Sequence, residues 1–79
     1  MHEVQVRYFA ALKEQRGCSE EMVAIRPGET AQQLYERLFP AINGQRLTVM
    51  FAINQHYAQP ETQVCTGDEV AFIPPLGGG

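Results

Sequence analysis

Basic residues are scarce in this sequence of 79 residues, and long apolar runs are absent. Six lysines and arginines stand against nine aspartates and glutamates, which gives a formal net charge of −3. A nucleic-acid-binding domain needs a basic stripe, and an anionic membrane surface attracts basic segments, so this charge disfavours both partners. No apolar run approaches the ~20 residues that cross a bilayer. The opening segment MHEVQVRYFA alternates polar and apolar residues, unlike a signal peptide, and we therefore expect a cytoplasmic protein.

Residue combinations that bind metals or catalyse reactions are also missing. The two cysteines, Cys18 and Cys65, form no CxxC motif, and His2 and His56 have no partner at ligand spacing, which disfavours a metal site. We expect two free thiols in a reducing compartment, and a disulfide is the open alternative. The sequence contains neither GxxxxGKS/T nor GxGxxG, and no Ser/His/Asp or Cys/His set. We expect a protein that binds no cofactor and is not catalytic alone.

The first part of the chain has the pattern of a strand, a short helix and a second strand. Val4, Val6 and Tyr8 recur at every second position, which predicts a strand that runs to about Phe9 with one face buried. The segment AALKEQRG that follows is rich in helix formers and ends in glycine, as a short helix does. EEMVAIRPG is the second strand, which the turn residues RPGE end. The connection is too short for a parallel crossover, so we expect the two strands to pair antiparallel.

The segment ETAQQLYERLFP predicts the clearest helix. Thr30 is a good N-cap, and Gln33 completes a capping box with it. Pro40 ends the helix, and a loop, AINGQR, follows. One apolar stripe lies at the spacing i, i+3, i+4 and i+7, which is typical of a helix that covers a core: Ala31, Leu34, Tyr35 and Leu38.

The last part of the chain predicts more strands. LTVMFAINQ is the most apolar stretch and indicates a central strand. HYAQPETQV is irregular, with a short edge strand near Val64 as an option. Gly67 and Asp68 supply a tight turn, and EVAFIP forms the last strand, which Pro74 and Pro75 stop.

One amphipathic helix and one sheet predict a two-layer α+β fold. The right-handed crossover rule and the hydrophobicity of the outer segments place the N- and C-terminal strands in the middle. This is the β-grasp, or ubiquitin-like, plan: a mixed four- to five-stranded sheet covered by one main helix. The pattern does not force the sheet order. We expect a β-grasp domain over residues 1–74 and an extended, glycine-rich tail over residues 75–79.

Apolar residues fall on the face of the sheet that the helix does not cover. Strand alternation points Ile73 outward, and it points Phe9 outward or leaves it at the strand exit. Pro74, Pro75 and Leu76 follow beyond the sheet. We predict that Phe9, Ile73 and Leu76 form an exposed apolar patch at the root of the tail, which is typical of a partner surface. The alternative is that Phe9 packs under the short helix and that Ile73 is one of the scattered apolar residues of any surface.

We interpret the tail as an extended segment whose function is to bring the C-terminal carboxylate to another protein. From Pro75 to Gly79 it reaches about 17 Å, and the proline stiffens its root. A tip without Cβ atoms can enter a channel that excludes other residues. Because a free carboxylate is a poor acyl donor and the chain has no catalytic set, a separate protein must activate it. A frayed end without function is the alternative.

Three segments, RYFAALKEQRG, AINQ and TGDEVAFIPPLGGG, resemble the MoaD family, the small subunit of molybdopterin synthase. These are sulfur carriers of the ubiquitin-like superfamily. The resemblance covers the whole chain, and its specific part is the C-terminal block that ends in glycines. Gly77 departs from the small Ala, Ser or Thr that the family more often has there, which should make the tip more flexible.

The resemblance implies a sulfur-carrying subunit. A MoeB-like, E1-type adenylyltransferase consumes ATP to activate the carboxylate of Gly79, and sulfur then gives a thiocarboxylate. The tip, Gly77 and Gly78 with Gly79, enters the active site of a MoaE-like large subunit in a heterotetramer, where sulfur passes to cyclic pyranopterin monophosphate. The family's apolar partner contacts correspond to Phe9, Ile73, Pro74, Pro75 and Leu76.

Three other readings stay open. A ThiS-type carrier for thiamin thiazole shares the β-grasp plan and the glycine end, although such chains are usually shorter and lack the FAALKE segment. A ubiquitin-like modifier would be joined to lysines through Gly79, and Lys13 is the only lysine on which this chain could be extended. The third reading is a plain interaction domain with an inert tail.

Overall fold

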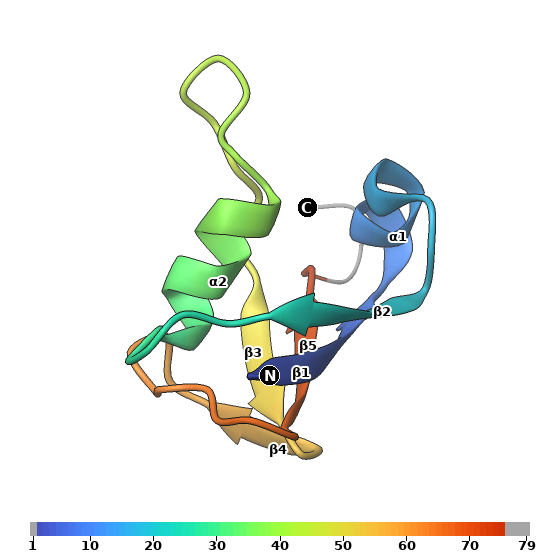
Figure 1. Cartoon of the computed structure of the whole chain (residues 1–79). Helices are drawn as coiled ribbons and strands as arrows, with labels where there is room; N and C mark the ends of the chain where they lie inside the picture. Colours follow the sequence, from blue (N-terminus) through green and yellow to red (C-terminus); the bar gives the residue numbers. More distant parts are fainter. Residues whose placement is uncertain (1, 76–79) are drawn as a thin grey trace.

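In the computed structural model, which describes residues 2–75, five strands form one mixed sheet with the order β2-β1-β5-β3-β4 (Figure 1). The strands are β1 (Glu3–Tyr8), β2 (Glu20–Ala24), β3 (Met50–Ile53), β4 (His56–Ala58) and β5 (Glu69–Ile73). The helices are α1 (Ala10–Arg16) and α2 (Ala31–Leu38). The predicted β-grasp architecture is confirmed.

The first and last strands lie side by side inside the sheet, as the sequence predicts. β5 is the middle strand and pairs parallel with β1, with Tyr8 opposite Phe72. All other pairs are antiparallel, including β1 with β2 and β5 with β3. The predicted antiparallel pairing of the first two strands is therefore confirmed. Because β5 is the middle strand, the chain leaves the sheet from its centre after Ile73.

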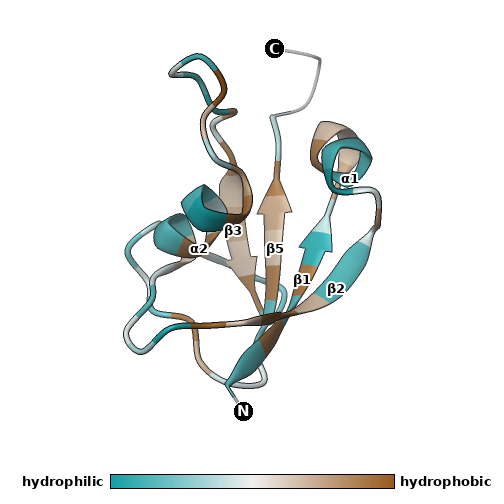
Figure 2. Cartoon of the chain, turned by 45° about the horizontal axis from the view of Figure 1, so that its top comes forward, coloured by the Kyte–Doolittle hydropathy of each residue, from teal (hydrophilic) through white to brown (hydrophobic). Residues whose placement is uncertain are grey.

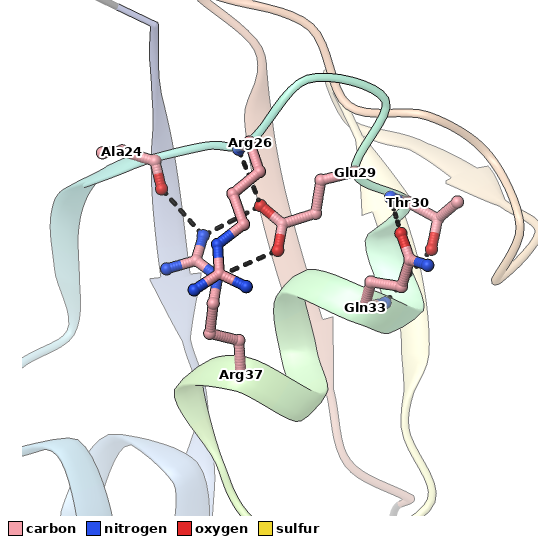
Figure 3. A network of polar contacts seen from close by, with 6 residues as sticks. All are labelled: Ala24, Arg26, Glu29, Thr30, Gln33 and Arg37. Carbon is pink, nitrogen blue, oxygen red and sulfur yellow. Dashed lines mark hydrogen bonds and ion pairs between the residues drawn. The ribbon is translucent and has the colours of Figure 1, made fainter.

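The predicted caps define both helices. Gly17 closes α1 in the left-handed conformation, with φ 80°. The backbone N–H of Gln33 donates to Thr30 Oγ1 at 3.1 Å, and the backbone N–H of Thr30 donates to Gln33 Oε1 at 3.0 Å (Figure 3). The capping box at the start of α2 is confirmed. At the other end Phe39 is the C-cap, directly before Pro40.

The core lies between α2 and the covered face of the sheet. Val4, Val6 and Tyr8 are buried, whereas the residues between them are not, as the period of two predicts. Five aromatic side chains meet over the middle of the sheet, and the ring centroids of Tyr35 and Phe72 are 5.1 Å apart. Such pairs add about 0.5–1.5 kcal/mol each beyond area burial. The cluster consists of Tyr8, Tyr35, Phe39, Phe51 and Phe72.

Two predicted strand positions are wrong. β3 begins at Met50 and not at Leu47, because Met50 pairs with Ile73 and the next residue of the neighbouring strand is Pro74, which has no N–H to donate. The edge strand is β4, not a strand near Val64. Val64 is buried, but its N–H donates to the backbone oxygen of Glu29 in the connection before α2.

The missed edge strand is joined to β3 by a tight hairpin. Asn54 and Gln55 both have positive φ, 53° and 69°, as the central residues of a type I′ turn require. Asparagine at the first of these positions was the available signal. No helix within residues 2–75 is long and apolar enough to cross a membrane.

Candidate functional site at the root of the tail

The face of the sheet that α2 leaves open carries small and apolar side chains on its inner strands. Ala71 and Ile73 of β5 point to this face, because Val70 and Phe72 are buried on the other. The register places Ala52 opposite Ala71 and Met50 opposite Ile73. Figure 2 shows β5 and β3 as apolar ribbons next to the more polar β1 and β2. We call this surface the open face.

Phe9 and Ile73 line one hollow on the open face, with a volume of about 260 Å³. Phe9 is 40% exposed and Ile73 is half-buried, so neither is a core residue. The exposure of Phe9 disfavours its packing under the short helix, whereas the partner role of Ile73 stays a prediction. Pro74 is half-buried and Pro75 is exposed, directly beyond the end of β5. The hollow is lined by Arg7, Phe9, Ala52, Tyr57, Ala71 and Ile73, together with Gln55 and Glu69.

Part of the predicted site lies outside the described residues. This concerns Leu76 and the glycines Gly77, Gly78 and Gly79, so the contribution of Leu76 to the patch stays a prediction. That Phe9, Ile73, Pro74 and Pro75 bind a partner also stays a prediction. What the structure gives is their geometry, with Phe9 and Ile73 beside the point where the chain leaves the sheet.

Sequence reasoning missed two large residues of the open face. Tyr57 of β4 is 74% exposed and lies opposite Ala52, and Met50 is 56% exposed. Reading Asn54-Gln55 as a hairpin turn would have placed Tyr57 on this face, because a two-residue turn sets the register of the strands it joins. The apolar surface therefore extends from the root of the tail across to the β4 edge.

A charged pair holds the rim of the hollow. Arg7 Nη1 lies 3.3 Å from Glu69 Oε2, and the guanidinium carbon of Arg7 lies 5.7 Å from the centroid of the Phe9 ring. At this distance the electron-rich face of an aromatic ring attracts a cation. Since Arg7 is largely exposed, the ion pair contributes at most about 1 kcal/mol. Arg7 therefore contacts both Glu69 and the Phe9 ring at the rim of the hollow.

A second polar cluster fixes α1 beside the tail root. The Tyr8 hydroxyl donates to Glu21 Oε2 at 2.6 Å, and Arg16 Nε donates to the same oxygen at 2.5 Å. Burial, and then the hydrogen bond to Glu21, raise the pKa of Tyr8 above its ordinary value. Hydrogen bonds from Tyr8 and Arg16 lower the pKa of Glu21. Strand β2 therefore holds α1, and with it Phe9, in one position.

The described residues offer little chemistry of their own. Cys18 is half-buried and Cys65 is exposed, and both are free thiols. His2 Nδ1 lies 3.0 Å from Thr66 Oγ1, and His56 Nδ1 lies 3.0 Å from the backbone oxygen of Asn54. Within residues 2–75, no three His, Cys, Asp or Glu side chains gather as a metal site would require. The described residues thus form a folded domain with an apolar surface beside the point where the chain leaves the sheet.

Comparison with known proteins gives this arrangement a family. The model of the ThiS family matches residues 6–79. The chain belongs to the ThiS family. The match includes the glycines at the C-terminus as well as the folded domain.

Relatives with assigned functions are similar over their full length. The molybdopterin synthase sulfur carrier subunit of Chlamydomonas reinhardtii is 35% identical, and the alignment covers 98% of this chain and 99% of that one. The corresponding subunit of Mycobacterium tuberculosis is 36% identical over the whole of both chains. The resemblance to the molybdopterin synthase small subunits that the sequence indicates is thus confirmed.

Solved structures share the fold. Small archaeal modifier protein 1 of H. volcanii superimposes with a TM-score of 0.78 at 20% identity, covering 96% of this chain and all of that one. Subunits 1 and 2 of the molybdopterin-converting factor of Helicobacter pylori have been solved as a complex, which matches with a TM-score of 0.60 at 22% identity, covering 98% of this chain and 99% of the matched chain. At these identities the likeness concerns the β-grasp fold.

Proposed function

We propose that this chain is the sulfur carrier subunit of a molybdopterin synthase and carries sulfur as a thiocarboxylate on Gly79. The observation that carries the proposal is similarity at 35–36% identity, over nearly the full length, to two subunits with that function. The family match runs through residue 79, so it includes the group that would react.

The chemistry needs an activating partner. A MoeB-like adenylyltransferase joins the Gly79 carboxylate to AMP from ATP and releases pyrophosphate. A sulfur donor then displaces AMP, which leaves a thiocarboxylate. The terminal sulfur attacks cyclic pyranopterin monophosphate to form a thioester, and water then cleaves the thioester, which leaves the sulfur on the pterin and returns the carrier as a carboxylate. Two such transfers supply the dithiolene of molybdopterin.

The second partner is a MoaE-like large subunit, in a heterotetramer of two small and two large subunits. The open face supports this proposal, because apolar side chains around Phe9 and Ile73 adjoin the chain exit. A partner on this surface would hold Pro74, Pro75 and Leu76, and the narrow glycine tip would then reach its active site. The Helicobacter pylori relative, solved as a complex of subunits 1 and 2, supports a partner of this kind.

Intact mass spectrometry tests the sulfur chemistry. After incubation with a MoeB-like enzyme, ATP and a sulfur source, the mass should rise by the difference between sulfur and oxygen. Deletion of Gly79 should abolish the rise, whereas Gly77→Ala should retain it, because Gly77 does not carry the reactive group. An unchanged mass with an enzyme that modifies a known carrier in parallel would overturn the proposal.

A further inference from the structure

A second hollow lies on the opposite side of the tail root from the open face. It is a groove of about 390 Å³ between α1, the end of α2 and the loop of residues 40–47, a volume within the range of pockets that bind small ligands. Its lining includes Leu12, Gln15, Phe39, Ile42, Arg46 and Leu47. We call it the loop groove.

The outer wall of the loop groove is a formed turn. The backbone N–H of Ile42 donates to Gln45 O at 2.8 Å, and the N–H of Gln45 donates back to Ile42 O at 2.9 Å. Asn43 and Gly44 between them have φ of 53° and 75°, as a type I′ turn requires. Figure 1 shows this loop standing beyond the end of α2. The groove is therefore bounded by hydrogen-bonded structure on its loop side.

The wall of the groove is apolar and exposed. Ile42 is 69% exposed and Leu47 is 38% exposed, although both line a concave surface. The buried side chains of Leu12 and Phe39 form the floor. Burying apolar area of this kind is favourable by roughly 25 cal/mol per Å², so a segment with an aliphatic side chain would gain by lying here.

Among the described residues, the one charged side chain that lines the loop groove is a cation. This is Arg46, and the other polar lining side chains are three amides and the hydroxyl of Tyr35, which donates to the backbone oxygen of Leu47. Arg46 Nε donates to the backbone oxygen of Phe39 at 2.6 Å, which fixes the guanidinium at the groove. The closest carboxylate oxygen, on Glu36, is 3.9 Å from Nη1, which is beyond hydrogen-bond distance. Arg46 therefore has N–H groups available for a carboxylate ligand.

The chain leaves the sheet between the two walls of the groove. β5 pairs Phe72 with Tyr8, which directly precedes Phe9 and α1, and it pairs Ile73 with Met50, which follows the loop. Figure 2 shows the end of β5 between that loop and α1. Beyond Pro75 the sequence continues with one leucine and three glycines, which can reach about 14 Å.

We propose that, in the free protein, residues 76–79 of the same chain occupy the loop groove. The Leu76 side chain packs against Ile42 and Leu47, and the Gly79 carboxylate binds the Arg46 guanidinium. The segment and the groove match in chemistry, since one aliphatic side chain meets the apolar wall and one carboxylate meets the single cation. Three glycines between them add no side chain to a narrow site.

The consequence depends on the proposed function. A carboxylate held by Arg46 is unavailable to the activating enzyme, and a Leu76 side chain in the groove is unavailable to the large subunit. Partner binding must then draw the tail out of the groove, so the free carrier protects its reactive end until a partner is present.

Methyl NMR spectroscopy on the full, unmodified chain tests the proposal without any partner. We expect NOEs from the Leu76 methyl groups to those of Ile42 and Leu47. Their cross-peak intensities, relative to the diagonal peaks, should be unchanged on tenfold dilution. Arg46→Gln and conversion of the Gly79 carboxylate to a carboxamide should each remove most of this intensity. Arg26→Gln, at an exposed arginine that does not line the groove, is the matched control and should retain it.

Absence of these NOEs in the wild-type chain would overturn the proposal. So would intensities that fall on dilution, which would indicate the tail of a second copy, or equal intensities in the carboxylate and carboxamide forms. The carboxamide form keeps the test decisive if Arg46→Gln disturbs the loop. Because no sulfur chemistry is involved, failure here leaves the mass test of the carrier function unaffected.

Discussion

Arg37 of α2 donates hydrogen bonds from two nitrogen atoms to the carboxylate of Glu29 (Figure 3). Nε donates to Oε2 at 2.9 Å and Nη2 donates to Oε1 at 2.8 Å, and the same Nη2 donates to the backbone oxygen of Ala24 at 2.8 Å. Glu29 is only 5% exposed and also accepts the N–H of Arg26. One arginine thus joins the helix to the end of β2 and to the connection between them.

Loss of Arg37 should destabilise the fold. Arg37→Ala leaves a buried carboxylate without its charge partner, and we expect a loss of about 2–4 kcal/mol in the free energy of unfolding. Urea denaturation at neutral pH measures it. Arg26→Ala removes an exposed arginine from the same turn and should cost less than about 1 kcal/mol. Equal losses for the two variants would show that the Glu29–Arg37 pair contributes no more to the free energy of unfolding than an exposed arginine does.

The same pair predicts a pH dependence. The hydrogen bond from Arg37 lowers the pKa of Glu29. Its contribution to stability is therefore complete above the unfolded pKa of about 4.3 and is lost as the pH falls through the lower folded value. Glu29→Gln should be less stable than the wild type at pH 7, and the difference should shrink towards pH 3. Glu61→Gln, at an exposed carboxylate, should show a difference from the wild type that stays small throughout, whereas a constant gap for Glu29→Gln would contradict the prediction.

The capping box predicts a smaller effect. Thr30→Ala removes the acceptor for the Gln33 N–H and should cost about 1 kcal/mol in the free energy of unfolding. Thr48→Ala, in an exposed part of the chain before β3, is the control and should be within about 0.5 kcal/mol of the wild type. Thermal or urea unfolding of both variants measures the difference. A loss as small as that of the control would mean that the helix end has another donor or acceptor to replace the cap.

The open face makes a prediction about binding. Phe9→Ala should weaken binding of a MoaE-like subunit by at least about 1.4 kcal/mol, or tenfold in Kd, if Phe9 is an aromatic anchor of that interface. Calorimetric titration measures this, and the unfolding free energy should change less because Phe9 is 40% exposed. Met22→Ala is the matched control, since Met22 is exposed on β2, at the far edge of the same face, and does not line the hollow. Equal affinities for the two variants would remove Phe9 from the interface.

Local signals in the sequence predicted much of this fold. The period of two in β1 and β5 set the buried valines and placed Ile73 on the open face, because strand sterics depend only on neighbours along the chain. Thr30 and Gln33 located the start of α2 for the same reason.

What the sequence could not predict depends on partners far away in the chain. β3 starts at Met50 because Pro74 ends the neighbouring strand, which is a property of the pairing and not of residues 47–49. The Glu29–Arg37 pair joins a loop to the far end of a helix, and the loop groove joins α1 to a loop some 30 residues later. No pattern within one element contains these contacts. The β4 strand is different, because reading Asn54-Gln55 as a hairpin turn would have predicted it.

The parallel pairing of β1 with β5 has a consequence for biosynthesis. β5 is the middle strand of the sheet and also the last strand that a ribosome completes. Until Glu69–Ile73 has been synthesised, the β1–β2 pair and the β3–β4 pair are not joined in one sheet. A chain interrupted before β5 therefore cannot close the core, and the terminal glycines follow that strand after only three residues. If Gly79 carries sulfur as proposed, the group that reacts comes just after the strand that completes the sheet, so a chain that has this group has already made every strand of the fold.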